Sequence, residues 1–324
     1  MHVALSLGVA ALLALAGGMA GAQAADVDAG HPAMRAQAVA EGTWFVQGLA
    51  ALGSAANRNF ISNAGFVVAD DGVLVVDGLG SPALARQLLG LIRQQTPLPV
   101  KWVLVTHCHA DHLYGLQVLQ QAGAQIVAHP GCRDYLASDT ARLRLQASRD
   151  ELFPWIDEHT RLVTPDRWLS AEGPAGAELL PGRPRWQVLH AGPAHTPEDL
   201  VLLDRQTGVL FAGDIVFRGR IPFVGSADSR HWLAALDRIL ALQPRLLLPG
   251  HGPVSQDPLA DLRLTRDYLA YLRQTMGAAA RDMQPFDEAY DRTDWSRFRD
   301  LPLFAAANRM NAYNTYLLME REPP

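Results

Sequence analysis

The chain has 324 residues, of which 49% are hydrophobic, and its formal net charge is −5 at pH 7. This length and apolar content are sufficient for a large core, and a single two-sheet domain of more than about 200 residues is compatible with them. With this slight excess of acidic residues, the composition does not indicate the positively charged surface that binds nucleic acid. We therefore expect no nucleic-acid partner.

The N-terminal segment predicts export. Residues 1–24 contain no Asp, Glu, Lys or Arg, and the apolar run 3–16 is followed by small residues suited to cleavage. This pattern is typical of a secretory signal peptide. Because the run is shorter than the ~20 residues of a spanning helix, an uncleaved anchor is the alternative rather than the expectation. We expect a periplasmic or secreted protein with no membrane span after signal cleavage.

Hydrophobic periodicity and turn residues predict alternating strands and helices along the rest of the chain. Ser81-Pro82 begins a helix that reaches Gln95, because proline suits the first helical turn. The predicted antiparallel strands before this helix are 43–46, 59–68 and 72–77. Later strands are predicted at 102–106, 124–128, 161–163, 186–189 and 246–248, with a hairpin at 200–211. Further helices are predicted within 130–159 and at 229–242 and 259–280, and a Gly/Pro-rich loop at 173–184.

Residues 107–112 read His-Cys-His-Ala-Asp-His and directly follow an apolar strand-like run. Three imidazoles and a carboxylate in one turn are costly to desolvate unless a cation compensates them. His107 and His109 are two residues apart and point to the same side of an extended segment, whereas Asp111 and His112 follow where a helix begins. The pattern predicts two ligands for each of two metal ions. Nitrogen and oxygen ligands favour zinc, although iron and manganese accept similar sets.

Three further polar residues follow apolar strand-like runs: His195 before a threonine, Asp214 after a glycine, and His251 between two glycines. Strand ends that recur along one sheet could converge on one edge. For each motif alone, a surface histidine or an ordinary turn is the alternative. Their joint appearance in this order favours one metal centre.

The ordered motifs His-x-His-x-Asp-His, Gly-x-x-His-Thr, Gly-Asp and Gly-His-Gly resemble those of the metallo-β-lactamase-fold hydrolase superfamily. The resemblance covers roughly residues 40–255 and implies an α/β fold, the αββα four-layer sandwich. It implies two zinc ions per chain, with Asp214 bridging them. The remaining ligands would divide into His107, His109 and His195 on one ion and Asp111, His112 and His251 on the other.

The domain expectation is a signal peptide at 1–24, a catalytic domain at 40–255, and a helical C-terminal extension at 256–324. The aromatic tail of this extension could pack on the catalytic domain or form a homodimer contact, and the sequence does not decide between them.

The chemistry expected of such a site is hydrolysis by an activated water, because two cations ~3.5–4 Å apart lower the pKa of a water between them. The resemblance makes Asp111 both a ligand and the catalytic acceptor for the attacking water. An aspartate at position 214 resembles thioester and phosphoester hydrolases, whereas true metallo-β-lactamases generally carry a different residue there. We expect an exported binuclear zinc hydrolase of a small ester, thioester or related compound. The alternatives are a metallo-β-lactamase and a mononuclear iron oxygenase of sulfur compounds.

Substrate contacts are predicted after Asp214, in residues 217–225, a segment that resembles the exported quinoprotein relay system zinc metallohydrolases. Arg218 and Arg220 could hold an anionic substrate group, since a guanidinium matches carboxylate or phosphate bidentately. Ordinary surface ion pairing is the alternative. Asn63 could donate a hydrogen bond to an oxyanion.

The two cysteines, Cys108 and Cys132, follow neighbouring predicted strands of a right-handed βαβ unit, so a disulfide between them is feasible. A free Cys108 thiol that turns away from the metals is the alternative. We expect the Thr106 and Thr196 hydroxyls to steady the ligand loops from outside the metal centre.

Overall fold

The computed structural model describes residues 33–322, apart from 174–175, 181–182 and 226. The predicted signal peptide, residues 1–24, therefore lies outside the described residues. Within the described part, the strands form two sheets. The first sheet runs in chain order: β1 (Ala36–Ala40), β2 (Thr43–Val46), β3 (Ala64–Val68), β4 (Val73–Val76), β5 (Val100–Leu104), β6 (Gln125–Ala128) and β7 (Arg167–Trp168).

The second sheet has the order β12-β11-β10-β9-β8. Its strands are β8 (Ala177–Leu180), β9 (Arg183–His190), β10 (Leu200–Asp204), β11 (Val209–Phe217) and β12 (Leu246–His251). The helices on the side of the first sheet are α1 (Pro82–Gln95), α2 (Ala110–Leu113), α3 (Leu116–Gln121), α4 (Cys132–Leu136) and α5 (Asp139–Glu151). Those on the side of the second sheet are α6 (Ser229–Ala241), α7 (Pro258–Arg281), α8 (Phe286–Arg292) and α9 (Phe304–Arg321).

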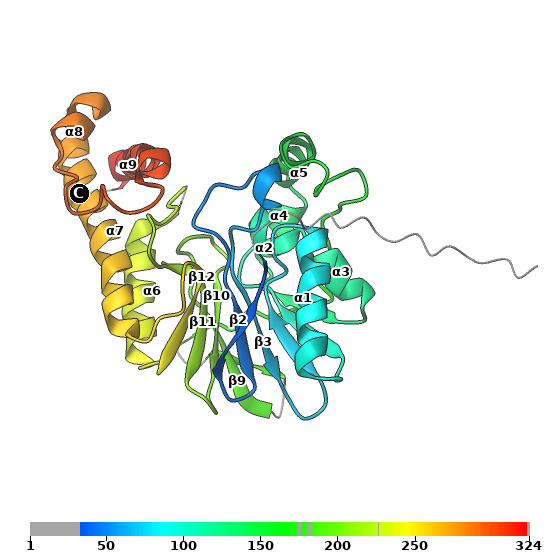
Figure 1. The fold of residues 1–324 in the computed structure, drawn as a ribbon. Coiled ribbons are helices and arrows are strands. Elements are labelled where there is room, and N and C mark those ends of the chain that lie inside the picture. The colour runs from blue at the N-terminus through cyan, green and yellow to red at the C-terminus, as the bar shows by residue number, and fades with distance from the viewer. Residues whose placement is uncertain (1–32, 174–175, 181–182, 226, 323–324) are drawn as a thin grey trace, which may run out of the picture. The chain divides into compact units, whose positions relative to one another are not determined.

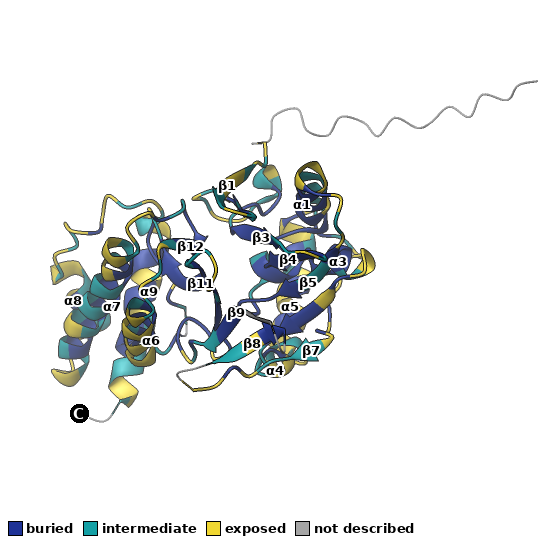
Figure 2. Cartoon of the chain, turned by 90° about the horizontal axis from the view of Figure 1, so that it is seen from below, coloured by how far each residue is buried: buried dark blue, intermediate teal, exposed yellow. Residues whose placement is uncertain are grey.

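Figure 1 shows the two sheets packed face to face, with helices outside each of them. Alternating side chains produce these layers, because neighbouring residues of a strand point to opposite faces. In β4, Val73 and Val75 pack in the cluster beneath α1, whereas Leu74 and Val76 pack in the cluster between the sheets. The buried strands form the dark interior of Figure 2. The αββα sandwich with a C-terminal helical region is confirmed.

The direction of strand pairing brings the polar motifs to one edge of the sandwich. β4, β5 and β6 are parallel neighbours, so the motif after β5 lies beside the end of β4. In the second sheet, β11 and β12 are parallel and end close together. The expectation that the motifs share one sheet is therefore wrong: each sheet contributes part of the centre, and the two edges meet.

The structure corrects three predicted elements. The strand predicted at 59–68 begins only at Ala64, because Arg58 and Asn59 have φ values of +59°, a left-handed conformation that interrupts an extended strand. The predicted strand 161–163 is irregular, and β7 follows it. The segment 173–184, predicted as a loop, contains β8 and the start of β9. Its glycines and prolines obscured this edge hairpin.

The C-terminal helices belong to the same compact unit as the sheets, which spans Met34–Pro324. Tyr268 and Leu272 of α7 are buried with Ala312 and Tyr316 of α9 in the cluster that also covers the second sheet. Within the described residues, no helix is both long and apolar enough to cross a membrane.

Candidate metal centre

The seven histidine and aspartate side chains singled out in the sequence meet where the two sheets end. The first sheet supplies His107 and His109 from the extended segment after β5, and Asp111 and His112 from α2. From the second sheet, His195 lies between β9 and β10, Asp214 lies within β11, and His251 is the last residue of β12.

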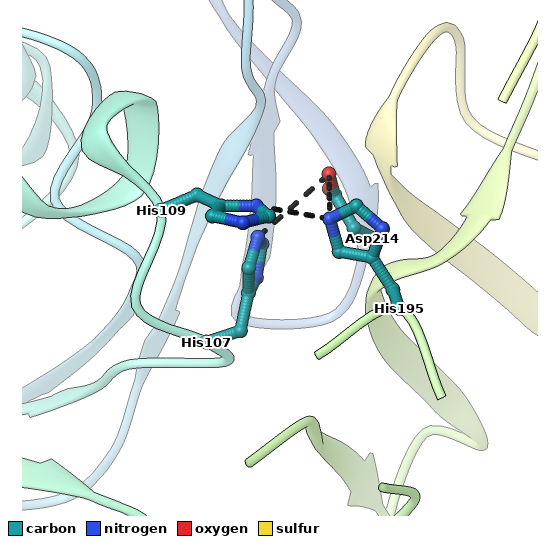
Figure 3. Close-up of side chains that lie close together, drawn as sticks. All are labelled: His107, His109, His195 and Asp214. Carbon is teal, nitrogen blue, oxygen red and sulfur yellow. Dashed lines mark hydrogen bonds and ion pairs between the residues drawn. The ribbon is translucent and has the colours of Figure 1, made fainter. Parts of the chain in front are cut away.

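One group of donors consists of His107, His109, His195 and Asp214, drawn in Figure 3. The Nε2 atom of His195 lies 3.0 Å from Nδ1 of His109 and 3.4 Å from Oδ2 of Asp214. Nε2 of His107 lies 3.7 Å from the same carboxylate oxygen. The three rings thus present nitrogen atoms to one small volume beside the carboxylate.

The second group consists of Asp111, His112 and His251. Nε2 of His251 lies 3.3 Å from Oδ2 of Asp111 and 3.3 Å from Oδ2 of Asp214. Nε2 of His112 lies 3.4 Å from the other oxygen of Asp214, Oδ1. Asp214 therefore contacts both groups, which is the position that a bridging carboxylate needs.

These spacings fit metal ions. Ligand atoms about 2.0–2.2 Å from a tetrahedral zinc ion are about 3.3–3.6 Å from one another, and the separations given above scatter around that value. Several inward-facing atoms are also buried without a hydrogen-bond partner among the described residues: His107 Nε2, His112 Nε2 and Asp214 Oδ1. A buried polar atom without a partner is costly unless something unseen satisfies it. The donor set is therefore suited to divalent cations.

Protonation states in the first group match what metal ligation requires. Burial lowers the pKa of His195 to about 3 and holds the pKa of His107 well below its usual value. Burial alone would raise the pKa of Asp214, but the nearby His251, His112 and His107 hold it well below the usual range. Neutral imidazoles and an ionised carboxylate are the ligand forms of these groups.

In the second group, nearby carboxylates outweigh the effect of burial on the pKa of His112. Burial would lower the pKa of His112, but Asp111, Asp77 and Asp214 together raise it well above its usual value. Without a cation, a proton on this imidazole compensates the surrounding negative charge. A metal ion can take the place of that proton, so metal binding at this group would release protons.

Asp77 is the functional residue that sequence reasoning missed. It follows β4 and has a φ of +65°, which turns its carboxylate under the metal motif. Its Oδ2 lies 2.9 Å from Nδ1 of His112, and it accepts hydrogen bonds from the backbone N–H and hydroxyl of Thr106 at 2.8 and 2.9 Å. An Asp-Gly pair directly after an apolar strand was the available signal. The carboxylate orients the imidazole so that Nε2 faces the centre.

Other outer contacts fix the remaining ligand loops. Nδ1 of His251 lies 2.7 Å from the carbonyl oxygen of Ile61. Thr106 Oγ1 lies 3.1 Å from Nδ1 of His107. Thr196 donates its backbone N–H and its hydroxyl to Asp199, at 2.7 and 2.9 Å. Both threonine hydroxyls therefore have the supporting contacts predicted for them.

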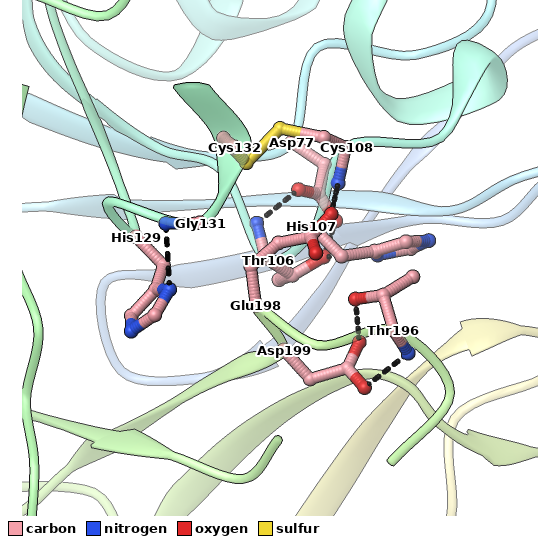
Figure 4. The surroundings of a disulfide bond; sticks show 10 residues. All are labelled: Asp77, Thr106, His107, Cys108, His129, Gly131, Cys132, Thr196, Glu198 and Asp199. Carbon is pink, nitrogen blue, oxygen red and sulfur yellow. Dashed lines mark hydrogen bonds between the residues drawn. A yellow bond between two sulfur atoms is a disulfide. The ribbon is translucent and has the colours of Figure 1, made fainter. Parts of the chain in front are cut away.

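Cys108 and Cys132 form a disulfide, which decides between the two alternatives left open by the sequence. Figure 4 shows the bond next to His107, and the backbone N–H of Cys108 donates to Oε1 of Glu198 at 3.2 Å. The bond joins the segment between His107 and His109 to the start of α4. It restrains the segment that carries two candidate ligands.

The three predicted substrate contacts have different surroundings. Asn63 donates both amide hydrogens to backbone carbonyls, at 2.7 Å to Pro249 and 2.8 Å to Gly252, so none remains for an oxyanion. Arg218 binds Asp261 at 2.6 Å and the carbonyl of Val254 at 2.9 Å. Arg220 alone of the three faces the centre, as a lining residue of the cavity above it.

Two cavities adjoin the candidate metal centre and share His109, Tyr135 and Phe223 in their walls. One, of about 260 Å³, lies over Asp111, Asp214 and His251. The other, of about 570 Å³, opens beside His195. A substrate bond placed over the centre can therefore have one part in each cavity.

The sequence profile of the Metallo-beta-lactamase superfamily matches residues 57–251. The chain belongs to this superfamily, and all seven candidate ligands fall within the matched range.

Curated relatives differ in what they act on. The chain is 24% identical over 237 residues to a linear primary-alkylsulfatase of Pseudomonas, covering 64% of this chain and 45% of that one. It is 25% identical over 193 residues to a metallo-beta-lactamase type 2 of Bacillus (58% and 65%). The chain is also 32% identical over 130 residues to the hydroxyacylglutathione hydrolase GloC of Haemophilus influenzae, covering 40% of this chain and 55% of that one. The chain spans about half the length of several curated relatives.

Solved structures with the same fold include the metallo-beta-lactamase FIM-1 of Pseudomonas aeruginosa in its mono-zinc form. The TM-score is 0.56 at 19% identity, over 74% of this chain and 96% of that one. A metallo-beta-lactamase of Erythrobacter litoralis gives 0.57 at 20% identity, over 73% and 96%. At these identities the likeness concerns the fold.

Proposed function

We propose that the protein is an exported hydrolase with two zinc ions per chain, acting on a small ester, thioester or related compound. The single observation that carries this proposal is the position of Asp214, whose carboxylate contacts imidazoles of both donor groups at 3.3–3.7 Å. The first ion would be held by His107, His109 and His195, and the second by Asp111, His112 and His251. Export rests on the signal-like residues 1–24, and the likeness of residues 217–225 to the exported quinoprotein relay branch belongs to the same proposal.

When bound, a pair of dications would lower the pKa of an attacking water and polarise the substrate oxygen. The chain's own residues supply the rest. The five histidines would hold the ions through their nitrogen lone pairs, and the Asp111 carboxylate would accept the proton that the water loses. Phe217 and Phe223 form apolar parts of the wall of the smaller cavity. No side chain is required as a nucleophile.

Metal content and a substrate panel test the proposal. The purified protein is expected to contain about two zinc ions per chain by elemental analysis. It should hydrolyse at least one member of a panel of carboxylic ester, thioester, phosphoester, sulfate ester and lactone substrates. One iron and no zinc would favour the oxygenase alternative, and turnover restricted to β-lactams would favour the β-lactamase alternative. N-terminal sequencing of protein recovered from the periplasm tests signal cleavage.

A further inference from the structure

Arg220 is a buried cation that lines the smaller cavity beside the candidate metal centre. Its side chain lies in the loop after β11, and the residue is only 6% exposed. No carboxylate among the residues that the structure describes forms an ion pair with it. Its contacts are the carbonyl oxygen of Ile221 at 3.4 Å and Nδ1 of His251 at 3.3 Å. A guanidinium has three nitrogen atoms with five N–H donors, and these two contacts engage only Nε and one of the terminal nitrogens.

Burial lowers the pKa of Arg220, whereas two carboxylates of the candidate metal centre, Asp214 and Asp111, favour its charged form. Dications at that centre would neutralise both of them. Arg220 would then add a positive charge that forms no ion pair with a carboxylate of the described residues, in a buried place where an uncompensated charge is costly. An anionic ligand in the cavity would supply the missing charge.

The cavity that Arg220 lines has both polar and apolar walls, which suits a ligand with an anionic group and an apolar part. It extends over Asp111, Asp214 and His251, and its apolar walls include Leu52 and Phe223. These two side chains are 61% and 39% exposed, so they form an apolar mouth. The other cation in the wall, Arg144, is already paired with Glu151. Arg220 is therefore the cation available to a ligand.

The C-terminal helices hold the Arg220 loop in place. The backbone N–H of Ile221 donates to the carbonyl of Pro302 at 3.0 Å. Asn311 of α9 accepts from the N–H of Val224 at 2.9 Å and donates to the carbonyl of Pro222 at 2.7 Å. The Arg220 guanidinium also lies 5.7 Å over the ring of Phe217. A charge fixed in this way binds an anion without first being ordered.

From these contacts we propose that Arg220 binds an anionic group of the substrate beside the metal centre, with an apolar part of the substrate at Leu52 and Phe223. This inference rests on the proposed hydrolase function and narrows its substrate class to small esters that carry a negative charge. Arg220 is a binding residue, and Asn311 is a positioning residue that acts through the loop.

Calorimetric titration with inorganic sulfate tests the subsite apart from catalysis. The zinc-loaded wild type should bind sulfate, and Arg220→Gln should weaken that binding at least about tenfold, as expected for loss of charge-assisted hydrogen bonds. Arg220→Lys should fall between the two. Arg142→Gln is the matched control: it removes the same charge from an exposed arginine paired with Asp139, and should bind like the wild type. Zinc content and thermal unfolding of each variant verify that the centre is intact.

A pair of esters of the same size then separates the subsite from the proposed function. For an ester with a free carboxylate, Arg220→Gln should raise KM at least about tenfold, while KM for its neutral methyl-capped analogue should stay within about twofold. Sulfate affinity equal in wild type and Arg220→Gln would overturn the subsite. Arg220-dependent sulfate binding without hydrolysis of any substrate would leave the subsite standing and reject the hydrolase.

Discussion

Asp77 shows how a residue outside the metal centre can set its geometry. Its carboxylate contacts His112 on one side and the backbone and hydroxyl of Thr106 on the other. The ring is thereby oriented before any ion arrives. In Asp77→Asn, an amide takes the place of one carboxylate oxygen and removes the negative charge that favours the required tautomer.

We expect Asp77→Asn to lower zinc affinity about 10- to 100-fold, the usual effect of losing such a partner. Competition with a chromogenic chelator measures this affinity. Asp71→Asn, a change at an acid of an exposed ion pair with Lys101, is the control and should retain wild-type affinity. Unchanged zinc affinity in Asp77→Asn would show that the carboxylate serves the fold rather than the centre.

The two donor groups predict separate effects of single histidine changes. Removal of one of three protein ligands weakens one ion most, so His195→Ala should empty mainly the first position and His251→Ala mainly the second. Each variant should retain about one zinc after dialysis, with activity reduced by orders of magnitude. Cobalt substitution and visible spectroscopy distinguish the two positions. Complete loss of both ions in each variant would contradict the partition.

At the scale of elements, the disulfide joins the metal motif to α4 across a sequence separation of 24 residues. Closing a loop of this length restricts the unfolded chain. The same bond fixes Cys108 between two candidate ligands, so its effects should extend to the centre.

The Cys108→Ser/Cys132→Ser double variant should lower the free energy of unfolding by about 2–4 kcal/mol. Chemical denaturation of the metal-free forms measures the loss, and chelator competition shows whether zinc affinity also falls. The wild type under reducing conditions should behave like the double variant. Equal stability of the oxidised and double-variant proteins would exclude this contribution.

A stacked histidine pair connects the two sheets. His129 follows β6 and His190 ends β9, and their rings lie 4.1 Å apart at an interplanar angle of 9°. Glu172 contacts both rings at 3.1–3.4 Å. These three residues resemble a metal-ligand set, but parallel rings direct their nitrogen lone pairs side by side rather than toward one ion. A pH-sensitive contact between the sheets is the better interpretation.

Burial, and then the neighbouring His190, lowers the pKa of His129. The unfolded chain therefore binds a proton more readily than the folded one below about pH 6.5. The contribution of this group to stability is complete above that pH and decreases as the pH falls toward its lower folded pKa. Urea denaturation of metal-free protein at pH 7.5 and 5.5 should show a smaller pH effect in His129→Gln than in the wild type. The exposed control, His159→Gln, should leave the pH effect unchanged.

At the scale of the whole molecule, the C-terminal helices support a loop beside the candidate metal centre. The superfamily match ends at residue 251, yet Asn311 and Pro302 hold the loop that carries Arg220. The extension thus acts on the site through buried hydrogen bonds, at a distance of about 90 residues in sequence from that loop.

Asn311→Ala should lower the free energy of unfolding by about 2–3 kcal/mol, because it leaves buried backbone groups of the loop without partners. Amide exchange at Ile221 and Val224 should become faster, and sulfate should bind more weakly. Tyr313→Ala, at an exposed position of the same helix, should leave both the amide exchange of the loop and the sulfate affinity unchanged. A destabilised Asn311→Ala protein with unaltered exchange in the loop would show that α9 supports the core but does not position Arg220.

The sequence by itself determined the elements and donors with strong local signals. The helix from Pro82 was predictable because its cap and apolar spacing are local, and the His-x-His-x-Asp-His motif because so many charged ligands in one turn need a compensating cation. The strand predicted at 59–68 was too long, because the left-handed conformation of Arg58 and Asn59 is not visible in the local pattern. Strand β8 was missed, because its pairing with β9 depends on contacts outside the local glycine-rich sequence.

Only the tertiary structure decided which long-range partners meet. Asp77 became a support for His112 because parallel pairing of β4 and β5 brings the two strand ends together. Arg218 and Arg220, separated by one glycine, were equivalent candidates in the sequence. In the structure Arg218 folds back onto Asp261, whereas Arg220 is buried over the centre without a carboxylate partner among the described residues. Burial and ion pairing depend on which residues are neighbours in three dimensions, so two arginines of one short segment can differ in whether their charges are paired.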